Sequence, residues 1–153
     1  MFHVVLVNPD IPYNTGNIGR TCIGLDAELH LVKPLGFQID DKHLRRAGLD
    51  YWKEINLTVH ETYNHFISTV NDKRLVFAST KANIDYFDYQ YKPGDYFIFG
   101  SESSGLPESI VYSNLERCVK IPMPGKIRSL NLSNAVSVIL YEAYRQCIKK
   151  LPG

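Results

Sequence analysis

Residues 121–138, IPMPGKIRSLNLSNAVSV, combine a stiff loop with the entrance of a helix. The two prolines and the glycine favour a rigid, open turn directly after an apolar run. Four small polar residues then crowd the helix entrance: Ser129, Asn131, Ser133 and Asn134. A helix N-terminus needs one or two such side chains as a cap, and we expect Ser133 or Asn134 to meet that need. Ser129 and Asn131 exceed it, which indicates a binding site.

Outward from this stretch, strand and helix patterns alternate along the chain. Short, mostly apolar runs rich in β-branched and aromatic residues predict six strands, at residues 4–7, 29–32, 55–59, 75–79, 96–99 and 118–121. Helical periodicity or capping residues predict helices at residues 15–26, 40–47, 62–70, 107–112 and 134–149. Strands that are apolar throughout are typical of sheets buried on both faces. We therefore expect an α/β fold, with a mainly parallel six-stranded sheet flanked by helices, in one domain of residues 1–153.

The composition suits one compact domain. The chain has 153 residues, of which 44% are hydrophobic and 22% charged, so wholesale disorder is disfavoured. Apolar stretches fall short of the roughly 20 residues that span a bilayer, and the first ten residues lack the basic part of a signal peptide. We expect a cytoplasmic protein with no membrane partner. The three cysteines are isolated and share no ligand spacing with the histidines, which predicts free thiols and no metal.

The charge is nearly balanced overall but unevenly distributed. A formal net charge of +1 does not by itself indicate a nucleic-acid binder. Basic residues nevertheless gather at 42–46 and beyond residue 126. Local patches of this kind bind phosphates in chains that are neutral overall. A solvated, charge-balanced surface is the simpler interpretation of the same pattern.

Two further strand exits carry unusual loops. Residues 8–20, NPDIPYNTGNIGR, place a cap and a glycine at the start of a helix and Arg20 about one turn in, which suits an anion; a capped helix with a solvated arginine explains them equally well. Residues 99–107, FGSESSGLP, set Glu102 between glycines; taken alone, a turn with a solvated glutamate is the simpler interpretation. The chain has no P-loop, no GxGxxG fingerprint and no GxSxG elbow.

The three loops are expected to meet, because ligands of parallel α/β sheets bind beyond the carboxyl ends of the strands. The predicted site combines glycine-permitted backbone approach with an Arg, a Glu, Ser and Asn side chains. Such a site suits a ligand that has a planar ring together with anionic or hydroxyl groups.

Together the loops resemble the SPOUT superfamily of S-adenosylmethionine-dependent RNA methyltransferases. NxGNIxR (residues 14–20), FGxExxGL (99–106) and IPMxxxxxSLNLSNAV (121–136) resemble its three motifs in the right order. DDKHLRRAGLDYW (residues 40–52) is further similar to the minimal single-domain group that 2′-O-methylates the wobble nucleotide of certain leucine tRNAs.

The resemblance implies a C-terminal trefoil knot, in which the last helix threads through a loop near residues 80–100. It implies a homodimer with the active site near the interface. The cofactor S-adenosylmethionine, which leaves as S-adenosylhomocysteine, would bind in a bent form inside the knot. The positions that match its binding residues are Ala78, Gly100, Ile121, Met123, Ser129 and Leu130.

The implied reaction is in-line attack of a ribose 2′-OH on the methyl carbon. The matching catalytic positions are Arg20, Asn14, Glu102, Ser129 and Asn131. Because arginine has a pKa above about 12, we expect Arg20 to clamp a phosphate and orient the hydroxyl rather than remove its proton. We expect Lys126 to face the RNA, and the residues predicted to contact tRNA are Lys81, Arg45, Arg46 and Arg128.

Other functions stay open at this point. The same chemistry could act on another tRNA position or on ribosomal RNA, and RRAGLDY favours the wobble nucleotide. A non-catalytic RNA- or nucleotide-binding module is disfavoured because the matching polar residues are intact: Arg20, Glu102, Ser129 and Asn131. Without the resemblance, a nucleotide-binding protein of flavodoxin type would remain.

Overall fold

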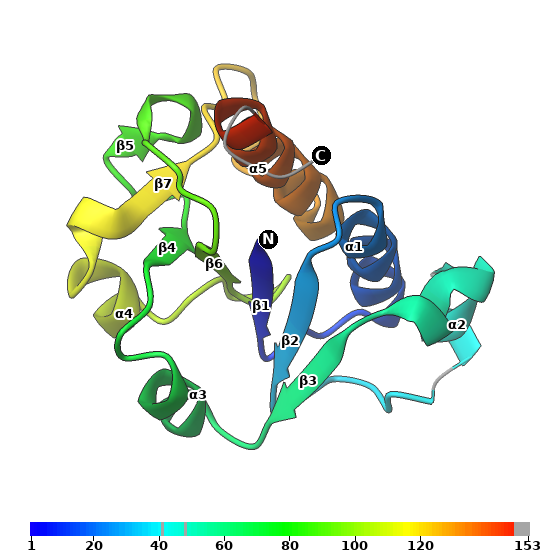
Figure 1. The fold of residues 1–153 in the computed structure, drawn as a ribbon. Coiled ribbons are helices and arrows are strands. Elements are labelled where there is room, and N and C mark those ends of the chain that lie inside the picture. Colours follow the sequence, from blue (N-terminus) through cyan, green and yellow to red (C-terminus); the bar gives the residue numbers. More distant parts are fainter. Residues whose placement is uncertain (41, 48, 149–153) are drawn as a thin grey trace.

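A computed structural model describes residues 1–40, 42–47 and 49–148 (Figure 1). Its centre is a seven-stranded sheet in the order β3-β2-β1-β6-β4-β7-β5, in which every described pairing is parallel. The strands are β1 (His3–Val7), β2 (Glu28–Val32), β3 (Leu57–His60), β4 (Leu75–Ala78), β5 (Ile84–Asp85), β6 (Tyr96–Phe99) and β7 (Cys118–Lys120). The six predicted strands are confirmed. The sequence did not indicate β5, because two residues are too few to show a periodicity.

The five predicted helices are present, with shifted ends. They are α1 (Pro12–Gly24), α2 (Lys42–Ala47), α3 (Tyr63–Thr69), α4 (Glu108–Tyr112) and α5 (Leu132–Cys147). A 3₁₀ segment, η1 (Leu49–Glu54), precedes β3. Residues 41 and 149, which belonged to two of the predicted helices, lie outside the described residues.

Two predicted helix caps are wrong. α5 is capped by Asn131, whose side-chain oxygen accepts from the backbone N–H groups of Ser133 (2.9 Å) and Asn134 (3.4 Å). Ser133 and Asn134 therefore lie inside the helix. α1 begins three residues before the predicted start, because Pro12 suits the first helical position. Its cap position is Ile11, whose side chain accepts no hydrogen bond.

Helices cover both faces of the sheet (Figure 1). α1 and α5 pack on one face, where Val4 and Leu6 of β1 belong to a core with Ile139 of α5. Val5 and Val7 point to the other face and join a second core that includes residues of α3 and α4. Strand side chains alternate between faces, so each central strand supplies both cores. This explains why the strand sequences are apolar throughout.

The chain threads through itself near its C-terminal end. β7 lies between β4 and β5, although β4 and β5 are successive strands, so residues 79–83 must cross β7. Residues 86–95 then return to β6 past α5. There Gln146 donates from Nε2 to the carbonyl of Tyr89 and accepts at Oε1 from the N–H of Tyr91, both at 3.0 Å. The path from β7 to α5 thus runs inside the loop of residues 79–95, as the predicted trefoil knot requires.

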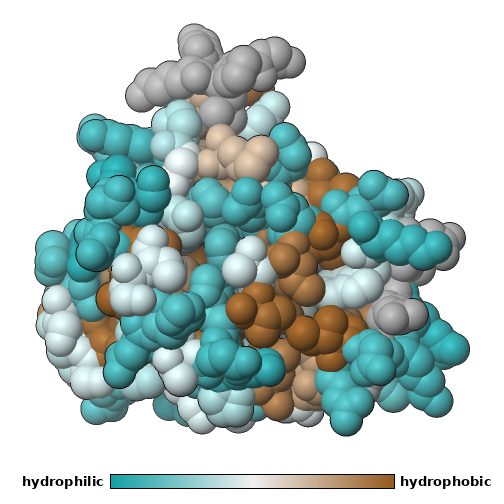
Figure 2. Space-filling model, turned by 60° about the horizontal axis from the view of Figure 1, so that its bottom comes forward, coloured by the Kyte–Doolittle hydropathy of each residue, from teal (hydrophilic) through white to brown (hydrophobic). Residues whose placement is uncertain are grey.

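The surface is mainly polar. On the face shown in Figure 2, the largest hydrophobic patch is bordered by hydrophilic groups, and smaller hydrophobic areas lie elsewhere on the same face. Within the part of the chain that the structure describes, every helix is too short or too polar to cross a membrane.

Candidate functional site

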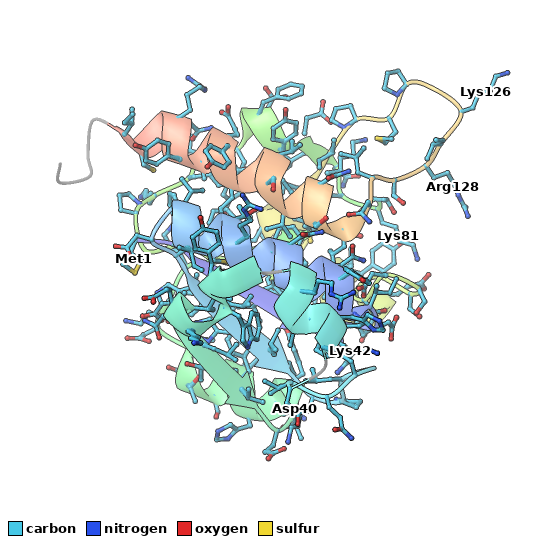
Figure 3. The ribbon with its side chains drawn as sticks, turned by 90° about the vertical axis from the view of Figure 1, so that its right-hand side faces the viewer. Met1, Asp40, Lys42, Lys81, Lys126 and Arg128 are labelled. Atoms are coloured by element: carbon cyan, nitrogen blue, oxygen red, sulfur yellow. The ribbon has the colours of Figure 1, made fainter. Side chains whose placement is uncertain are left out.

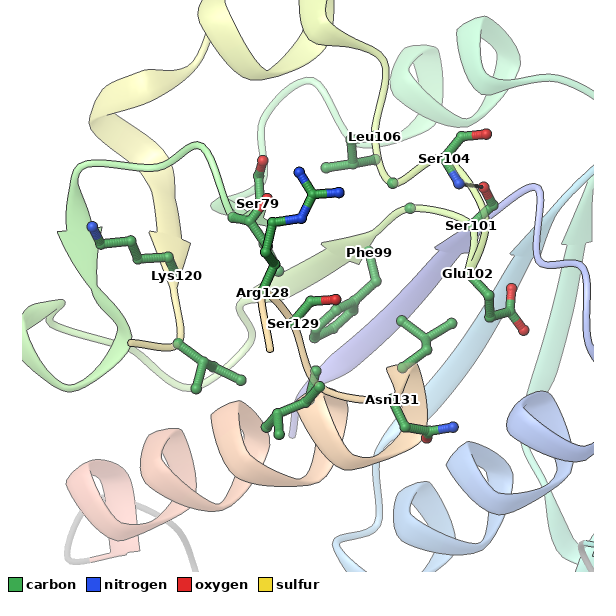
Figure 4. Close-up of a pocket in the computed structure, with 18 of the residues that line it drawn as sticks. Ser79, Phe99, Ser101, Glu102, Ser104, Leu106, Lys120, Arg128, Ser129 and Asn131 are labelled. Carbon is green, nitrogen blue, oxygen red and sulfur yellow. Dashed lines mark hydrogen bonds between the residues drawn. The ribbon is translucent and has the colours of Figure 1, made fainter. Parts of the chain in front are cut away.

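The three loops singled out in the sequence meet in one pocket of about 490 Å³ (Figure 4). It lies beyond the carboxyl ends of β6, β4 and β7, where parallel α/β sheets bind ligands. Its walls are residues 78–81, 99–106, 119–121 and 128–132, with Ile11, Asn14, Ala135 and Ile139. Figure 4 shows Ser79, Glu102 and Ser129 around the same hollow, each contributed by a different loop.

Most residues predicted to bind the cofactor line this pocket. They are Ala78, Gly100, Ile121, Ser129 and Leu130. Met123 instead lines an adjoining hollow of about 370 Å³, which shares Ile121 and Arg128 with the first. The residues predicted to bind the cofactor therefore lie around the pocket and the hollow that adjoins it.

A chain of polar side chains ties the three loops together. The Glu102 carboxylate accepts hydrogen bonds from the backbone N–H groups of Asp10 (2.8 Å) and Ile11 (2.9 Å) and from Asn14 Nδ2 (3.1 Å). The side chain of Asn14 is buried and accepts at Oδ1 from Asn131 Nδ2 (3.0 Å). We call Glu102, Asn14 and Asn131 the loop network. Each of its members comes from a different motif.

The loop network also explains how α1 begins. No side chain within its own segment caps this helix. The Glu102 carboxylate takes up N–H groups at its start instead, and a negative charge is favourable at the positive end of a helix. Asn131 has two functions as well, because Oδ1 caps α5 while Nδ2 reaches Asn14. Three of the predicted catalytic residues thus position the walls of the pocket.

Gly100 is required by the loop itself. A β-carbon at this position would lie 2.0 Å from the carbonyl carbon of Gly105 and 2.1 Å from the nitrogen of Leu106. Gly105 has φ +67° and donates from its N–H to the carbonyl of Ser101 (2.9 Å). The sequence predicted that glycine here admits a ligand. In the structure, the group that approaches Gly100 is the backbone of Gly105 and Leu106.

Arg20 lies apart from the other predicted catalytic residues. It is exposed on α1 and does not line the pocket of its own chain. Its guanidinium carbon is 5.6 Å from the centre of the Tyr51 ring, within the range of a cation–π contact. Ser129, in contrast, lines the pocket, and its hydroxyl has no hydrogen-bond partner among the described residues.

The residues predicted to bind RNA divide into two groups. Lys81 and Arg128 line the pocket, and Lys126 lines the adjoining hollow; Figure 3 shows all three toward one side of the molecule. Lys81 pairs with Glu108, and this hydrogen bond raises the pKa of the lysine and lowers that of the carboxyl group. Arg46 is exposed on α2, whereas the side chain of Arg45 lies outside what the structure describes.

Several lining residues were missed by the sequence reasoning. Ser79 and Thr80 directly follow β4, and Lys120 ends β7. Their place at carboxyl ends of parallel strands is the signal that could have found them. Asp10 was also missed; it accepts from the Ser103 hydroxyl (2.6 Å) and reinforces the contact between two loops.

The cysteines take no part in the site. All three are buried and none forms a disulfide among the described residues, as predicted. Burial raises the pKa of Cys22 to about 12 and also raises that of Cys118. Thiols in this state are poor nucleophiles.

Comparison with known proteins agrees with this geometry. A model of the SpoU rRNA methylase family matches residues 1–141. The chain belongs to the SpoU rRNA methylase family. The resemblance to SPOUT methyltransferases is thereby confirmed.

Individual SpoU relatives match over nearly the whole chain. A tRNA (cytidine(34)-2′-O)-methyltransferase from Escherichia coli (strain K12) is 47% identical over 147 residues, which cover 95% of this chain and 94% of the relative. A solved structure described as "Structural insights into the 2-OH methylation of C/U34 on tRNA" has a TM-score of 0.93 at 43% identity and covers 97% of both chains. The SpoU methyltransferase AviRb from Streptomyces viridochromogenes, solved with AdoMet, has a TM-score of 0.86 at 26% identity and covers 96% of this chain and 60% of its own.

Proposed function

We propose that this SpoU methyltransferase transfers a methyl group from S-adenosylmethionine to a ribose 2′-OH of tRNA. The nucleotide is the wobble position, cytidine or modified uridine at position 34 of leucine tRNAs. The observation that carries the proposal is the loop network, in which Glu102, Asn14 and Asn131 fasten three motifs around one pocket. Relatives at 43–47% identity that match nearly end to end support the choice of substrate.

The pocket suits the cofactor in size and chemistry. Its volume of about 490 Å³ falls within the range usual for small-molecule sites. Apolar side chains of Ile121, Leu130 and Leu106 line it beside the hydroxyl groups of Ser79 and Ser129. This mixture fits an adenine ring next to the polar groups of an amino acid and a ribose. The bound cofactor would supply a methyl group that its sulfonium already activates.

The chain's own residues would supply orientation. The loop network holds residues 100–106 and 129–132 in fixed relation, so the cofactor and the nucleophile meet in one geometry. Arg20 would clamp a phosphate next to the target ribose and orient its hydroxyl. Its exposed position on α1 suits contact with RNA rather than with the cofactor.

We further propose that residues 1–153 act in the cytoplasm as a single SPOUT domain and as a homodimer. Three aromatic side chains of α1, η1 and α5 are about half exposed: Tyr13 at 44%, Tyr51 at 47% and Tyr141 at 51%. α1 lies against both α5 and η1, so these rings occupy neighbouring elements. Burying them against a second copy would remove apolar surface from water and would bring Arg20, which contacts Tyr51, to the interface.

The decisive test is complementation in a strain from which the encoding gene is deleted. We expect tRNA from the deletion strain to lack one 2′-O-methylated nucleoside at position 34. The wild-type gene should restore it, whereas Arg20→Ala should lower methylation by about 100-fold without unfolding the protein. Methylation lost at a different tRNA position or in ribosomal RNA would refute the wobble assignment. Normal methylation by Arg20→Ala would refute the role of Arg20.

A further inference from the structure

A cluster of histidines and a glutamate lies on the sheet, away from the pocket. β1 and β2 pair so that His3 stands opposite Glu28, and His30 follows on the same face of β2. His3 Nδ1 is 3.0 Å from His30 Nε2 and 3.1 Å from Glu28 Oε2, and His30 Nε2 is 3.7 Å from the same oxygen. Three potential ligand atoms therefore point at one small space.

The two rings can meet the Glu28 carboxylate with either protons or lone pairs. A neutral imidazole has one N–H and one lone pair. When His3 Nδ1 and His30 Nε2 both carry the proton, both can donate toward Glu28 Oε2. When the protons lie on the other ring nitrogens, two lone pairs and a carboxylate oxygen face one small space, which is the arrangement that binds a cation.

We propose that His3 Nδ1, Glu28 Oε2 and His30 Nε2 bind a zinc ion. Zinc takes imidazole nitrogen and carboxylate oxygen at about 2.0–2.2 Å in tetrahedral geometry, which sets neighbouring ligand atoms about 3.3 Å apart. The three measured separations, 3.0, 3.1 and 3.7 Å, lie on both sides of this value. The fourth position faces solvent, because the side chains of His3 and Glu28 are 18% and 31% exposed.

Neighbouring groups hold the ligands in place. His30 Nδ1 lies 3.0 Å from His60 Nε2, so the ring of His30 is fixed with Nε2 toward the site. The ring of His3 stacks on Tyr96, with centroids 3.9 Å apart. Support of this kind is typical of metal-binding histidines, whose second nitrogen is usually hydrogen-bonded.

The N-terminal amine and Lys73 are cations near His3, so a native N-terminus is essential in any binding measurement.

This zinc site is separate from methyl transfer. His3 begins β1, whereas the pocket lies beyond the carboxyl ends of the strands. Its ligands come from two adjacent strands, so the ion would clamp β1 to β2. The proposal stands or falls independently of the proposed function.

The test is a titration of tag-free, chelator-treated protein that begins at Met1. Co²⁺ serves as the spectroscopic probe, and Zn²⁺ affinity is measured by competition with a chromophoric chelator. We expect one equivalent to bind and to give the strong visible absorption of low-coordinate Co²⁺. Glu28→Gln should weaken Zn²⁺ binding by about tenfold or more, while its side-chain oxygen can still accept from Asn56. His65→Gln, at an exposed histidine outside the cluster, is the matched control.

His3→Gln is the second ligand variant and should show the same loss as Glu28→Gln. tRNA methylation should stay unchanged in both, because neither residue lines the pocket. The proposal is overturned if the wild-type protein binds no Zn²⁺, or if the ligand variants bind it as well as His65→Gln does.

Discussion

The loop network and the histidine cluster are two polar networks built in opposite ways. The loop network joins Glu102, Asn14 and Asn131, which come from three loops at the carboxyl edge of the sheet. The histidine cluster of His3, His30 and His60 runs across three adjacent strands within the sheet. The first network fastens loops to one another, whereas the second joins strands that their ladders already fix. We infer that both networks contribute to stability and that only the first also sets activity.

The largest expected effect is a loss of stability caused by a substitution within the loop of residues 99–107. Gly100→Ala should lower the free energy of unfolding by about 3–5 kcal/mol, because the new methyl group would meet backbone atoms at 2.0–2.1 Å. Urea unfolding measures the loss. Gly125→Ala is the control, since no atom lies within 4 Å of a β-carbon there, and it should stay within about 0.5 kcal/mol of wild type. Equal effects of the two changes would contradict this account of the loop.

Glu102→Ala removes the shared acceptor of the loop network. It would leave two backbone N–H groups and one amide without their partner, and we expect a loss of about 2 kcal/mol in stability. Methylation should fall by about tenfold or more, because the pocket walls lose their fixed relation. Glu116→Ala, at an exposed glutamate outside the pocket, should change neither quantity. Unchanged methylation by Glu102→Ala would remove the loop network from the mechanism.

His60→Gln tests the other half of the comparison. His60 is buried and bonded to His30, so the change should cost about 1–2 kcal/mol of stability. The methylation rate measured below the unfolding temperature should stay within about twofold of wild type. A large loss of methylation with normal stability would contradict the inference that the histidine cluster does not affect activity.

The smallest expected effect concerns the RNA surface. Arg46→Ala should make the dependence of tRNA affinity on salt shallower by about 0.7 in the log–log slope, the contribution of one phosphate contact in single-stranded RNA. Fluorescence anisotropy at several salt concentrations measures it. Lys92→Ala, at an exposed lysine just before β6, should leave the slope unchanged. The same slope for both variants would take Arg46 out of the interface.

The sequence predicted the loop network better than the histidine cluster, for a physical reason. Asn14, Glu102 and Asn131 lie in segments that leave the carboxyl ends of strands, and parallel topology brings such segments together. His3 and His30 lie 27 residues apart, and only the register of β1 against β2 makes them neighbours. No spacing in the chain reveals a register, so the expectation of no metal rested on cysteine and histidine spacing alone.

Other differences have local causes. Asn131 was assigned to the site and Ser133 or Asn134 to the cap, whereas Asn131 does both, since an asparagine side chain both accepts and donates. Arg20 was placed about one turn into its helix; the helix begins earlier, and the side chain stays outside the pocket. A shift of a few residues in a helix start changes which residue occupies the cap position.

The pocket cannot form until residues near the C-terminal end of the chain are present. Residues 119–121 and 128–132 form much of the pocket wall, and they lie toward the C-terminal end of the chain. A nascent chain that stops at residue 117 would have Glu102 and Asn14 but neither Asn131 nor Ser129. Such a chain would lack one wall of the pocket and could not hold a methyl donor in a fixed position. The pocket is therefore complete only in a chain that extends into α5.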